Sequence, residues 1–265
     1  MKHTHLLAVS LASFWFILFR RFNVVTSCHV QKLYPFDQRQ IHIAALVLAR
    51  GGSKGIKLKN LTTVNGKTLL AISLEEILKL PEFRSVWVST DHDLIYKEAV
   101  RISKEVNVHW RSEDSATDTA SSIFAVQEFL SFRPEIDVVA LIQCTSPFVH
   151  HTYLKNAILL MMHTDVDCVF SVSKSFKLRW IRTSNSAISA LNFDPAQRPR
   201  RQDWEGEFVE NGMFYFAKRS LLQQGVFQNQ NCEFVEIPEQ HALEIDSEYH
   251  LKLAQHLAQS TFSNI

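Results

Sequence analysis

The chain has 265 residues, 46% of them hydrophobic, and 28 Lys and Arg against 27 Asp and Glu give a formal net charge of +1. This is enough apolar material for one sizeable core, and the charge balance gives no reason to expect a nucleic acid partner. No Cys-x-x-Cys pair or Cys/His cluster has the spacing of a zinc site. Disulfide pairing stays open, and buried free thiols are the simplest expectation for the four cysteines: Cys28, Cys144, Cys168 and Cys232.

The N-terminus differs from the rest of the chain. Residues 6–19 form an apolar run broken only by two serines, with Lys2 before it and Arg20 and Arg21 after it. A membrane-spanning helix needs about 20 apolar residues, so this run is short for an anchor and suits the apolar part of a secretory signal. A cleaved signal peptide and a short signal-anchor over residues 1–21 both stay open, and a buried helix is a third interpretation. We expect entry into the secretory pathway, membrane contact through this segment alone, and a linker over residues 22–40.

The folded domain is predicted over residues 41–265. It opens with the continuous apolar run of residues 43–49, which ends in Arg-Gly-Gly. Such a run is typical of a central strand in a parallel sheet. Residues 66–80 then have the apolar spacing of an amphipathic helix, and Pro81 ends that helix.

Strands and helices continue to alternate along the chain. Further strands are predicted at residues 86–88, 138–142, 169–172 and 212–216. Further helices are predicted at residues 94–105, from a cap at Asp118 or Thr119 to Leu130, at 151–162, and after Ser247. This alternation indicates an α/β fold of three αβα layers with a mostly parallel sheet. Ligands of such folds bind outside the carboxyl ends of the strands, where the polar segments after Ala49, Val88 and Ile142 fall.

The loop of residues 48–60, Leu-Ala-Arg-Gly-Gly-Ser-Lys-Gly-Ile-Lys-Leu-Lys-Asn, is predicted to bind phosphate. Its three glycines let backbone N–H groups approach phosphate oxygens closely. It is not a Walker A loop, because Gly55 follows Lys54, and its glycines are wrongly spaced for a dinucleotide fingerprint. A solvated basic turn is the alternative. Four cationic side chains could neutralise a triphosphate: Arg50, Lys54, Lys57 and Lys59.

The full string resembles the N-terminal signature of the CMP-sialic acid synthetases (N-acylneuraminate cytidylyltransferases). The resemblance extends over about residues 43–258. The chain looks like the insect-like animal enzymes of this family that have an N-terminal secretory signal. It implies a Rossmann-like nucleotidyltransferase fold, a Golgi location, and a homodimer in which the polar excursion at residues 173–207 reaches the partner's active site. Six further blocks match in the family's order: residues 88–93, 118–122, 143–147, 198–204, 210–215 and 244–246.

The resemblance implies transfer of CMP from CTP to the 2-hydroxyl of a sialic acid, with release of pyrophosphate. Lys59 and Arg50 would act on the phosphates, and Lys59 would stabilise the charge that develops at the α-phosphate, as phosphoryl transfer requires. Further CTP-binding positions would be Ser53, Asn60, Arg111 and Ser121. Sialic acid would be bound by Gln143, Arg201, Asn211 and Tyr215.

The resemblance also implies a magnesium site at Glu244 and Asp246. The family usually has Asp-x-Asp there, so Glu244 is a departure. Residues two apart in a strand face the same side, which would let both carboxylates reach one Mg²⁺. Because Mg²⁺ requires near-ideal octahedral geometry, the added methylene is expected to affect the efficiency of metal binding more than its existence.

Several alternatives stay open at this stage. The chain could act on a related sugar acid such as 3-deoxy-octulosonate, or it could be a catalytically silent nucleotide-binding protein that lost turnover through Glu244. Residues 198–201 suit a sugar carboxylate clamp or a nuclear targeting signal. His92 could be a base or a metal ligand, although a loop histidine beside helix-capping carboxylates is the simpler interpretation. Asn60 also begins an N-glycosylation sequon, which would place a glycan beside the CTP loop.

Overall fold

The computed structural model describes residues 41–184 and 186–262. The predicted signal segment, the linker and Cys28 therefore lie outside the described residues. Within the described part, no helix is long and apolar enough to span a membrane.

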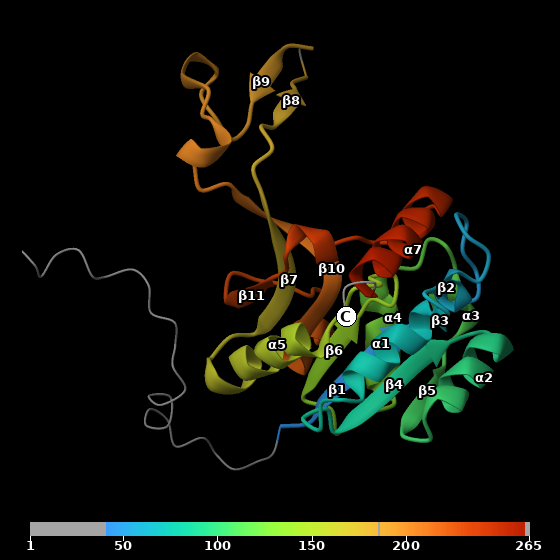
Figure 1. Cartoon of the computed structure of the whole chain (residues 1–265). Helices are drawn as coiled ribbons and strands as arrows, with labels where there is room; N and C mark the ends of the chain where they lie inside the picture. Colours follow the sequence, from blue (N-terminus) through green and yellow to red (C-terminus); the bar gives the residue numbers. More distant parts are fainter. Residues whose placement is uncertain (1–40, 185, 263–265) are drawn as a thin grey trace, which may run out of the picture. The chain divides into compact units, whose positions relative to one another are not determined.

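A seven-stranded sheet forms the centre of the domain (Figure 1), in the order β11-β7-β10-β6-β1-β4-β5. All neighbouring strands pair in parallel except β10, which is antiparallel to both β6 and β7. The mostly parallel sheet is thus confirmed. The strands are β1 (Ile43–Leu48), β4 (Ser85–Thr90), β5 (Val106–Trp110), β6 (Val138–Ile142), β7 (Cys168–Ser175), β10 (Glu207–Lys218) and β11 (Cys232–Glu236).

Helices cover both faces of this sheet, which confirms the three layers. Successive strand residues point to opposite faces, so Ala45 and Val47 of β1 pack on one side and Ala44 and Leu46 on the other. The first face is covered by α1 (Leu69–Ile77), α2 (Asp93–Ile102) and α5 (His151–His163). The second is covered by α4 (Ser122–Ser131) and α6 (Arg219–Gln223). The last helix, α7 (Glu248–Phe262), packs in a third apolar cluster with Leu69 of α1.

Two helices begin later than predicted, for local reasons. Asn65 and Gly66 have positive φ and form the turn of a small hairpin, β2 (Thr63–Val64) with β3 (Lys67–Thr68), so α1 starts only after Thr68 caps it. Helix α4 is capped by Ser121, whose hydroxyl accepts from the backbone N–H of Phe124. The predicted cap at Asp118 or Thr119 is therefore wrong.

Cys168 and Cys232 form a disulfide, which corrects the expectation of free thiols. They are direct partners in the parallel pairing of β7 with β11, although 64 residues separate them in sequence. Cys144 is buried and is the free cysteine of the described part.

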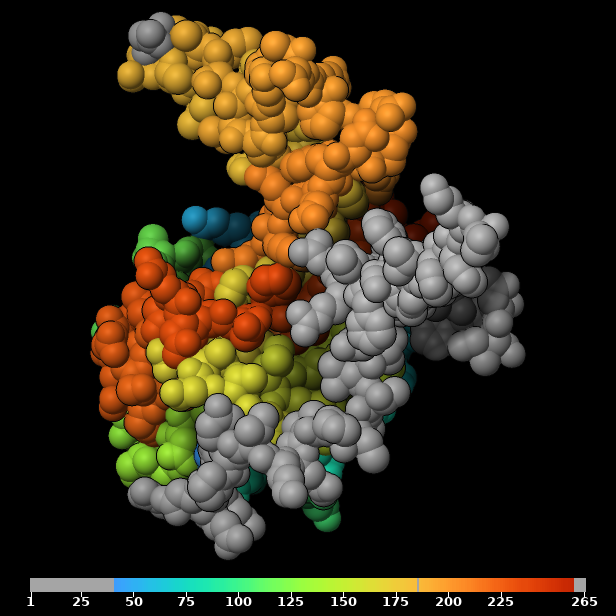
Figure 2. Space-filling model, turned by 90° about the vertical axis from the view of Figure 1, so that its left-hand side faces the viewer, coloured from blue at the N-terminus to red at the C-terminus, as the bar shows by residue number. Residues whose placement is uncertain are grey.

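Between β7 and β10 the chain leaves the sheet as predicted, although the strands extend to Ser175 and from Glu207, so the excursion covers residues 176–206. It carries a hairpin of β8 (Trp180–Arg182) and β9 (Ile188–Ala190), which Figure 1 shows apart from the main sheet. Two short 3-10 helices follow, η2 (Pro195–Gln197) and η3 (Arg201–Asp203). In Figure 2 the excursion stands clear of the rest of the domain.

Candidate active site

The glycine-rich loop leaves the carboxyl end of β1, where α/β folds bind ligands. The side chain of Asp91, which follows β4, accepts from the backbone N–H of Gly51 at 2.7 Å. Two glycines are sterically required. A Cβ on Gly51 would lie 2.6 Å from the ring of His92, and one on Gly55 would lie 2.6 Å from the backbone oxygen of Asp246. The loop backbone is therefore held at these two glycines, while the Lys54 side chain is 81% exposed.

Lys59 and Asp246 meet beside this loop. The Lys59 ammonium lies 3.0 Å from Oδ1 of Asp246, and 187 residues separate them in sequence. Lys59 belongs to the short helix η1 (Lys59–Leu61), and Asp246 comes just before α7. Lys59 is 18% exposed and Asp246 is 59% exposed, so the pair opens to solvent on the carboxylate side.

Glu244 completes this group of charges. Its Oε1 accepts from Thr145 Oγ1 at 3.2 Å, and the backbone N–H of Ile245 donates to the Thr145 carbonyl at 2.8 Å. The segment is not a strand, contrary to expectation, yet Ile245 is fully buried while the carboxyl groups on either side of it are not. Burial, and then the negative charge of Asp246, raise the pKa of the Glu244 carboxyl.

The two carboxylates fit a divalent metal ion. Carboxylate oxygens are the ligands that hard divalent cations take in proteins. Burial first, and the charge of Asp246 second, disfavour the ionised form of Glu244, and a cation beside the two carboxylates would offset both effects. The longer Glu244 side chain is half-buried and hydrogen-bonded to Thr145, and its carboxyl group still interacts with the charge of Asp246.

Arg50 lies at the other side of the loop. It pairs with Asp118, and Lys54 lies 3.5 Å from the same carboxylate. Hydrogen bonding from Arg50 holds the pKa of Asp118 below its usual range. The predicted nucleotide segment at residues 118–122 is thus beside the loop. Ser53 lies within the loop, and the hydroxyl of Ser121 serves as the cap of α4.

Arg111 follows β5 and is partly buried. It donates to the backbone oxygen and to Oγ of Ser115, and burial lowers the pKa of its guanidinium. Its charge interacts with those of Asp91 and Arg50, so it belongs to the same group as the loop.

Three of the four predicted sugar-binding residues lie at or beside an irregularity in β10: Gln143, Asn211 and Tyr215. The register of β10 against β7 shifts between Glu210 and Tyr215, where Gly212 has a φ of 75° and a Cβ would come 3.3 Å from Oε2 of Glu244. Asn211 donates to Ser173 Oγ at 2.9 Å, and the backbone N–H of Gln143 donates to the Met213 carbonyl.

The hydroxyl group of Tyr215 is protonated and donates a hydrogen bond at this irregularity. Its hydroxyl donates to Oε2 of Glu210 at 3.2 Å. Burial, then the charge of Glu210 and a contribution from Glu244, raise the pKa of Tyr215 to about 12. The irregularity therefore places Gly212 beside Glu244 and Tyr215 within reach of the charge of Glu244.

Arg201 is not part of this group. It lies in the excursion with its guanidinium 5.1 Å from the ring centroid of Phe176, which itself meets Trp204 edge to face. Among the described residues, no contact joins Arg201 to Lys59, Asn211 or Glu244.

His92 and His150 act as helix caps. The ring of His92 accepts from the backbone N–H of Leu94, and that of His150 from the backbone N–H of Thr152. The capping group at α2 is therefore the histidine itself, not a neighbouring carboxylate as expected. His150 and His151 do open a helix, as predicted.

Sequence reasoning missed the groups that hold Asn60. The amide of Asn60 donates to the Arg50 carbonyl at 3.1 Å and accepts from the Cys144 thiol at 3.0 Å. Asn60 is 7% exposed, so its amide positions the loop from within. The thiol stays protonated because burial raises the pKa of Cys144 to about 12. The signal in the sequence was weak, since 84 residues separate this pair.

A mostly parallel αβα sheet, whose first strand leads into a cationic loop beside two carboxylates, is the arrangement expected of a nucleotidyltransferase. A sequence model described as cytidylyltransferase matches residues 44–262. The chain belongs to this cytidylyltransferase family.

Relatives of this chain that are similar in sequence also have the names of cytidylyltransferases. N-acylneuraminate cytidylyltransferase A of Danio rerio is 39% identical over 221 residues, covering 82% of this chain and 51% of that protein. The N-acylneuraminate cytidylyltransferase of Oncorhynchus mykiss is 42% identical over 208 residues, covering 77% and 48%. That of Escherichia coli O18:K1:H7 is 30% identical over 216 residues, covering 80% and 51%. The chain thus spans about half the length of the curated relatives it matches.

Solved structures share the fold. A 4-diphosphocytidyl-2C-methyl-D-erythritol synthase from Anaerococcus prevotii superposes with a TM-score of 0.62 at 14% identity, covering 83% of this chain and 99% of that chain. A CMP:2-keto-3-deoxy-manno-octonic acid synthetase complexed with CTP gives 0.62 at 16% identity, with the same coverage. At these identities the likeness concerns the fold alone.

Proposed function

We propose that the chain is an N-acylneuraminate cytidylyltransferase, which transfers CMP from CTP to the 2-hydroxyl of a sialic acid for use in sialylation. The observation that carries the proposal is the meeting of Lys59 with Asp246 beside the glycine-rich loop. The loop supplies cations for a triphosphate, and the carboxylate pair supplies ligands for its metal ion. The names of the relatives support the sugar substrate.

In the proposed reaction the 2-hydroxyl oxygen bonds to the α-phosphorus of CTP. The bond from that phosphorus to the bridging oxygen breaks, pyrophosphate leaves, and the hydroxyl proton is lost to solvent. Lys59 stabilises the added negative charge at the α-phosphate, while Arg50 and Lys54 hold the other phosphates. Asp118 must release Arg50 and Lys54 when the triphosphate binds, since it pairs with both.

We propose Mg²⁺ as the metal ion, held by Glu244 and Asp246. When bound, it would polarise the phosphate oxygens and neutralise their charge. Asp246→Asn should raise the Mg²⁺ concentration needed for half-maximal rate, because it removes one anionic ligand. An unchanged metal requirement would contradict this assignment.

The sialic acid would be bound on the β10 side of the carboxylates. Gln143, Asn211 and Tyr215 offer amide and hydroxyl donors there, whereas Arg201 lies away in the excursion. We therefore propose that Arg201 reaches the site of a second copy. The excursion supports a homodimer, because four of its large apolar side chains are about half exposed or more: Trp180, Ile181, Ile188 and Leu191. Light scattering with size-exclusion chromatography should give the mass of a dimer.

We propose a secretory-pathway location, most simply the Golgi. The Cys168–Cys232 disulfide supports it, because such bonds persist in oxidising compartments. The apolar run at residues 6–19 would direct entry. Microscopy of a C-terminal fusion should show overlap with a Golgi marker, and a uniform cytosolic signal would contradict the location.

One assay tests the activity. The full chain is incubated with CTP, Mg²⁺ and either N-acetylneuraminate or 3-deoxy-octulosonate, and pyrophosphate release is measured. Release with N-acetylneuraminate supports the proposal, and preference for 3-deoxy-octulosonate would favour the related cytidylyltransferase. A folded protein that binds CTP without turnover would instead be the catalytically silent nucleotide-binding protein. In that case Glu244→Asp should restore turnover. Calorimetric titration with CTP separates that case from a protein that binds no nucleotide.

A further inference from the structure

A second group of metal-binding side chains lies outside the candidate active site, where α1 meets the start of α5. Glu76 comes from α1, and His150 and His151 lie at the N-terminus of α5. Each offers one ligand atom, and these atoms all lie within 4.8 Å of one another. We propose that these three side chains form a binding site for a divalent transition-metal ion of the zinc class. The proposal does not rest on the proposed activity.

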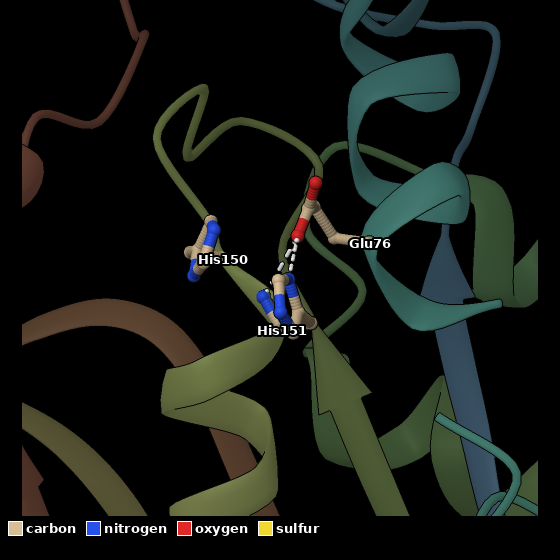
Figure 3. A group of neighbouring side chains, drawn as sticks. All are labelled: Glu76, His150 and His151. Carbon is tan, nitrogen blue, oxygen red and sulfur yellow. Dashed lines mark hydrogen bonds and ion pairs between the residues drawn. The ribbon is translucent and has the colours of Figure 1, made fainter. Parts of the chain in front are cut away.

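The carboxylate of Glu76 points at the ring of His151 (Figure 3). Its Oε2 lies 2.8 Å from His151 Nδ1, with a hydrogen bond between them. An ion in place of that proton would have one carboxylate oxygen and one imidazole nitrogen as ligands, both donor types that zinc takes. Glu76 is 15% exposed. Burial alone would raise its pKa, but hydrogen bonds from Lys79 and His151 outweigh this and lower the pKa, so the carboxylate is anionic.

His150 supplies the third ligand. Its Nδ1 lies 2.8 Å from the hydroxyl oxygen of Thr152, which can accept a proton from that nitrogen. This is not the tautomer that caps α5, in which Nδ1 accepts from the backbone N–H of Thr152. Metal binding would give up that cap, hold Nδ1–H by the Thr152 hydroxyl and leave the lone pair of Nε2 for the metal. Burial lowers the pKa of His150 although the charge of Glu76 acts in the opposite direction, so the ring favours its neutral, metal-binding form. The two histidine rings lie 4.1 Å apart between centroids.

Lys79 does not prevent binding. It pairs with the other oxygen of Glu76, Oε1, and its side chain is 49% exposed. Exposed ion pairs of this kind are weak, so Lys79 can move into solvent when a metal neutralises the carboxylate. Imidazole with carboxylate suits zinc better than magnesium, which prefers oxygen ligands alone. The bound ion would link α1 to α5, whose start follows the turn that carries Gln143 and Thr145.

Calorimetric titration of the full chain with Zn²⁺, in excess Mg²⁺, tests the site. The Mg²⁺ would compete with Zn²⁺ for the carboxylates of Glu244 and Asp246, where the proposed function places it. His150→Asn retains a side chain that can cap α5, and His151→Gln retains a donor for Glu76. His163→Gln, at the other end of α5, is the matched control. We expect one Zn²⁺ per chain for the wild type and the control, and an affinity at least ~10-fold lower for the other two variants. Equal affinity in all four proteins would overturn the proposal.

A second measurement needs no variant. The X-ray absorption spectrum of the zinc-loaded wild type should show two imidazole nitrogens together with oxygen ligands. A first shell of oxygen alone, or no zinc retained in the presence of Mg²⁺, would also overturn the proposal. The thermal midpoint of the wild type should rise with Zn²⁺, because a ligand that binds the folded state alone stabilises it. The midpoint of His151→Gln should rise less at the same Zn²⁺ concentration.

Discussion

The ammonium of Lys59 lies 3.0 Å from Oδ1 of Asp246. This contact joins the first loop of the domain to the segment before its last helix. It places a cation for the α-phosphate next to the carboxylate pair that suits a metal ion, so phosphate and metal would meet at one point. Two segments 187 residues apart must therefore come together before the site exists.

Lys59→Ala should reduce turnover far more than stability. Removing one charge that stabilises a transition state costs on the order of 10²–10³ in kcat. The pair with Asp246 is partly exposed, so its loss should change the free energy of unfolding by only about 0–1 kcal/mol. Rate measurements and urea unfolding check both values. Lys97→Ala, an exposed lysine of α2, is the control and should leave both unchanged.

Glu244→Gln should stabilise the metal-free protein at neutral pH. The folded-state pKa of Glu244 is raised, so its contribution to stability is present below the unfolded pKa and is lost as pH rises through the folded value. The neutral amide avoids that loss and can still accept from Thr145. Thermal unfolding in a chelator should give a higher midpoint for the variant at neutral pH, with the difference vanishing in acid. A difference that grows in acid would contradict the assignment.

Cys144→Ala should weaken the CTP loop. It leaves the carbonyl oxygen of the buried Asn60 amide without its donor, which costs about 1–3 kcal/mol of stability. The Michaelis constant for CTP should rise, because Asn60 also holds the Arg50 carbonyl. Cys144→Ser keeps a donor and should restore CTP affinity more than stability. If both variants bind CTP like the wild type, Cys144 has no positioning role.

Loss of the Cys168–Cys232 disulfide should destabilise the domain by about 2–4 kcal/mol. The bond closes a long loop, 64 residues in sequence, and fixes the edge strand β11 to β7. Denaturant unfolding of Cys232→Ala should show the loss, and reductant should produce the same shift in the wild type. Reductant should have no effect on the double variant Cys168→Ala/Cys232→Ala.

Active protein should carry no glycan on Asn60. The amide nitrogen to which a glycan would be attached donates to Arg50 within the packed loop, and the residue is 7% exposed. A glycan there would prevent the loop from closing. After secretory expression, mass spectrometry of the CTP-binding fraction should find Asn60 unmodified. A glycosylated fraction with full activity would show that the loop can close in another way.

Local patterns in the sequence predicted the central strands well, because β1 and β6 are buried on both faces and read as continuous apolar runs. The edge strands β5 and β11 were missed. They have two buried residues and one respectively, and they include the exposed polar residues Asn107 and Glu233, so no apolar run marks them. The start of α1 was placed too early because the Asn65-Gly66 turn was not recognised.

The sequence by itself determined the αβα class, the glycine-rich loop, and the residues that carry charge at the candidate site. Those features depend on local periodicity and on the order of short motifs along the chain. Only the tertiary structure decided which groups meet: Lys59 with Asp246, Cys144 with Asn60, and Cys168 with Cys232. Each of these contacts joins residues at least 64 positions apart, so sheet pairing and packing of the whole domain create them, and no local pattern records them.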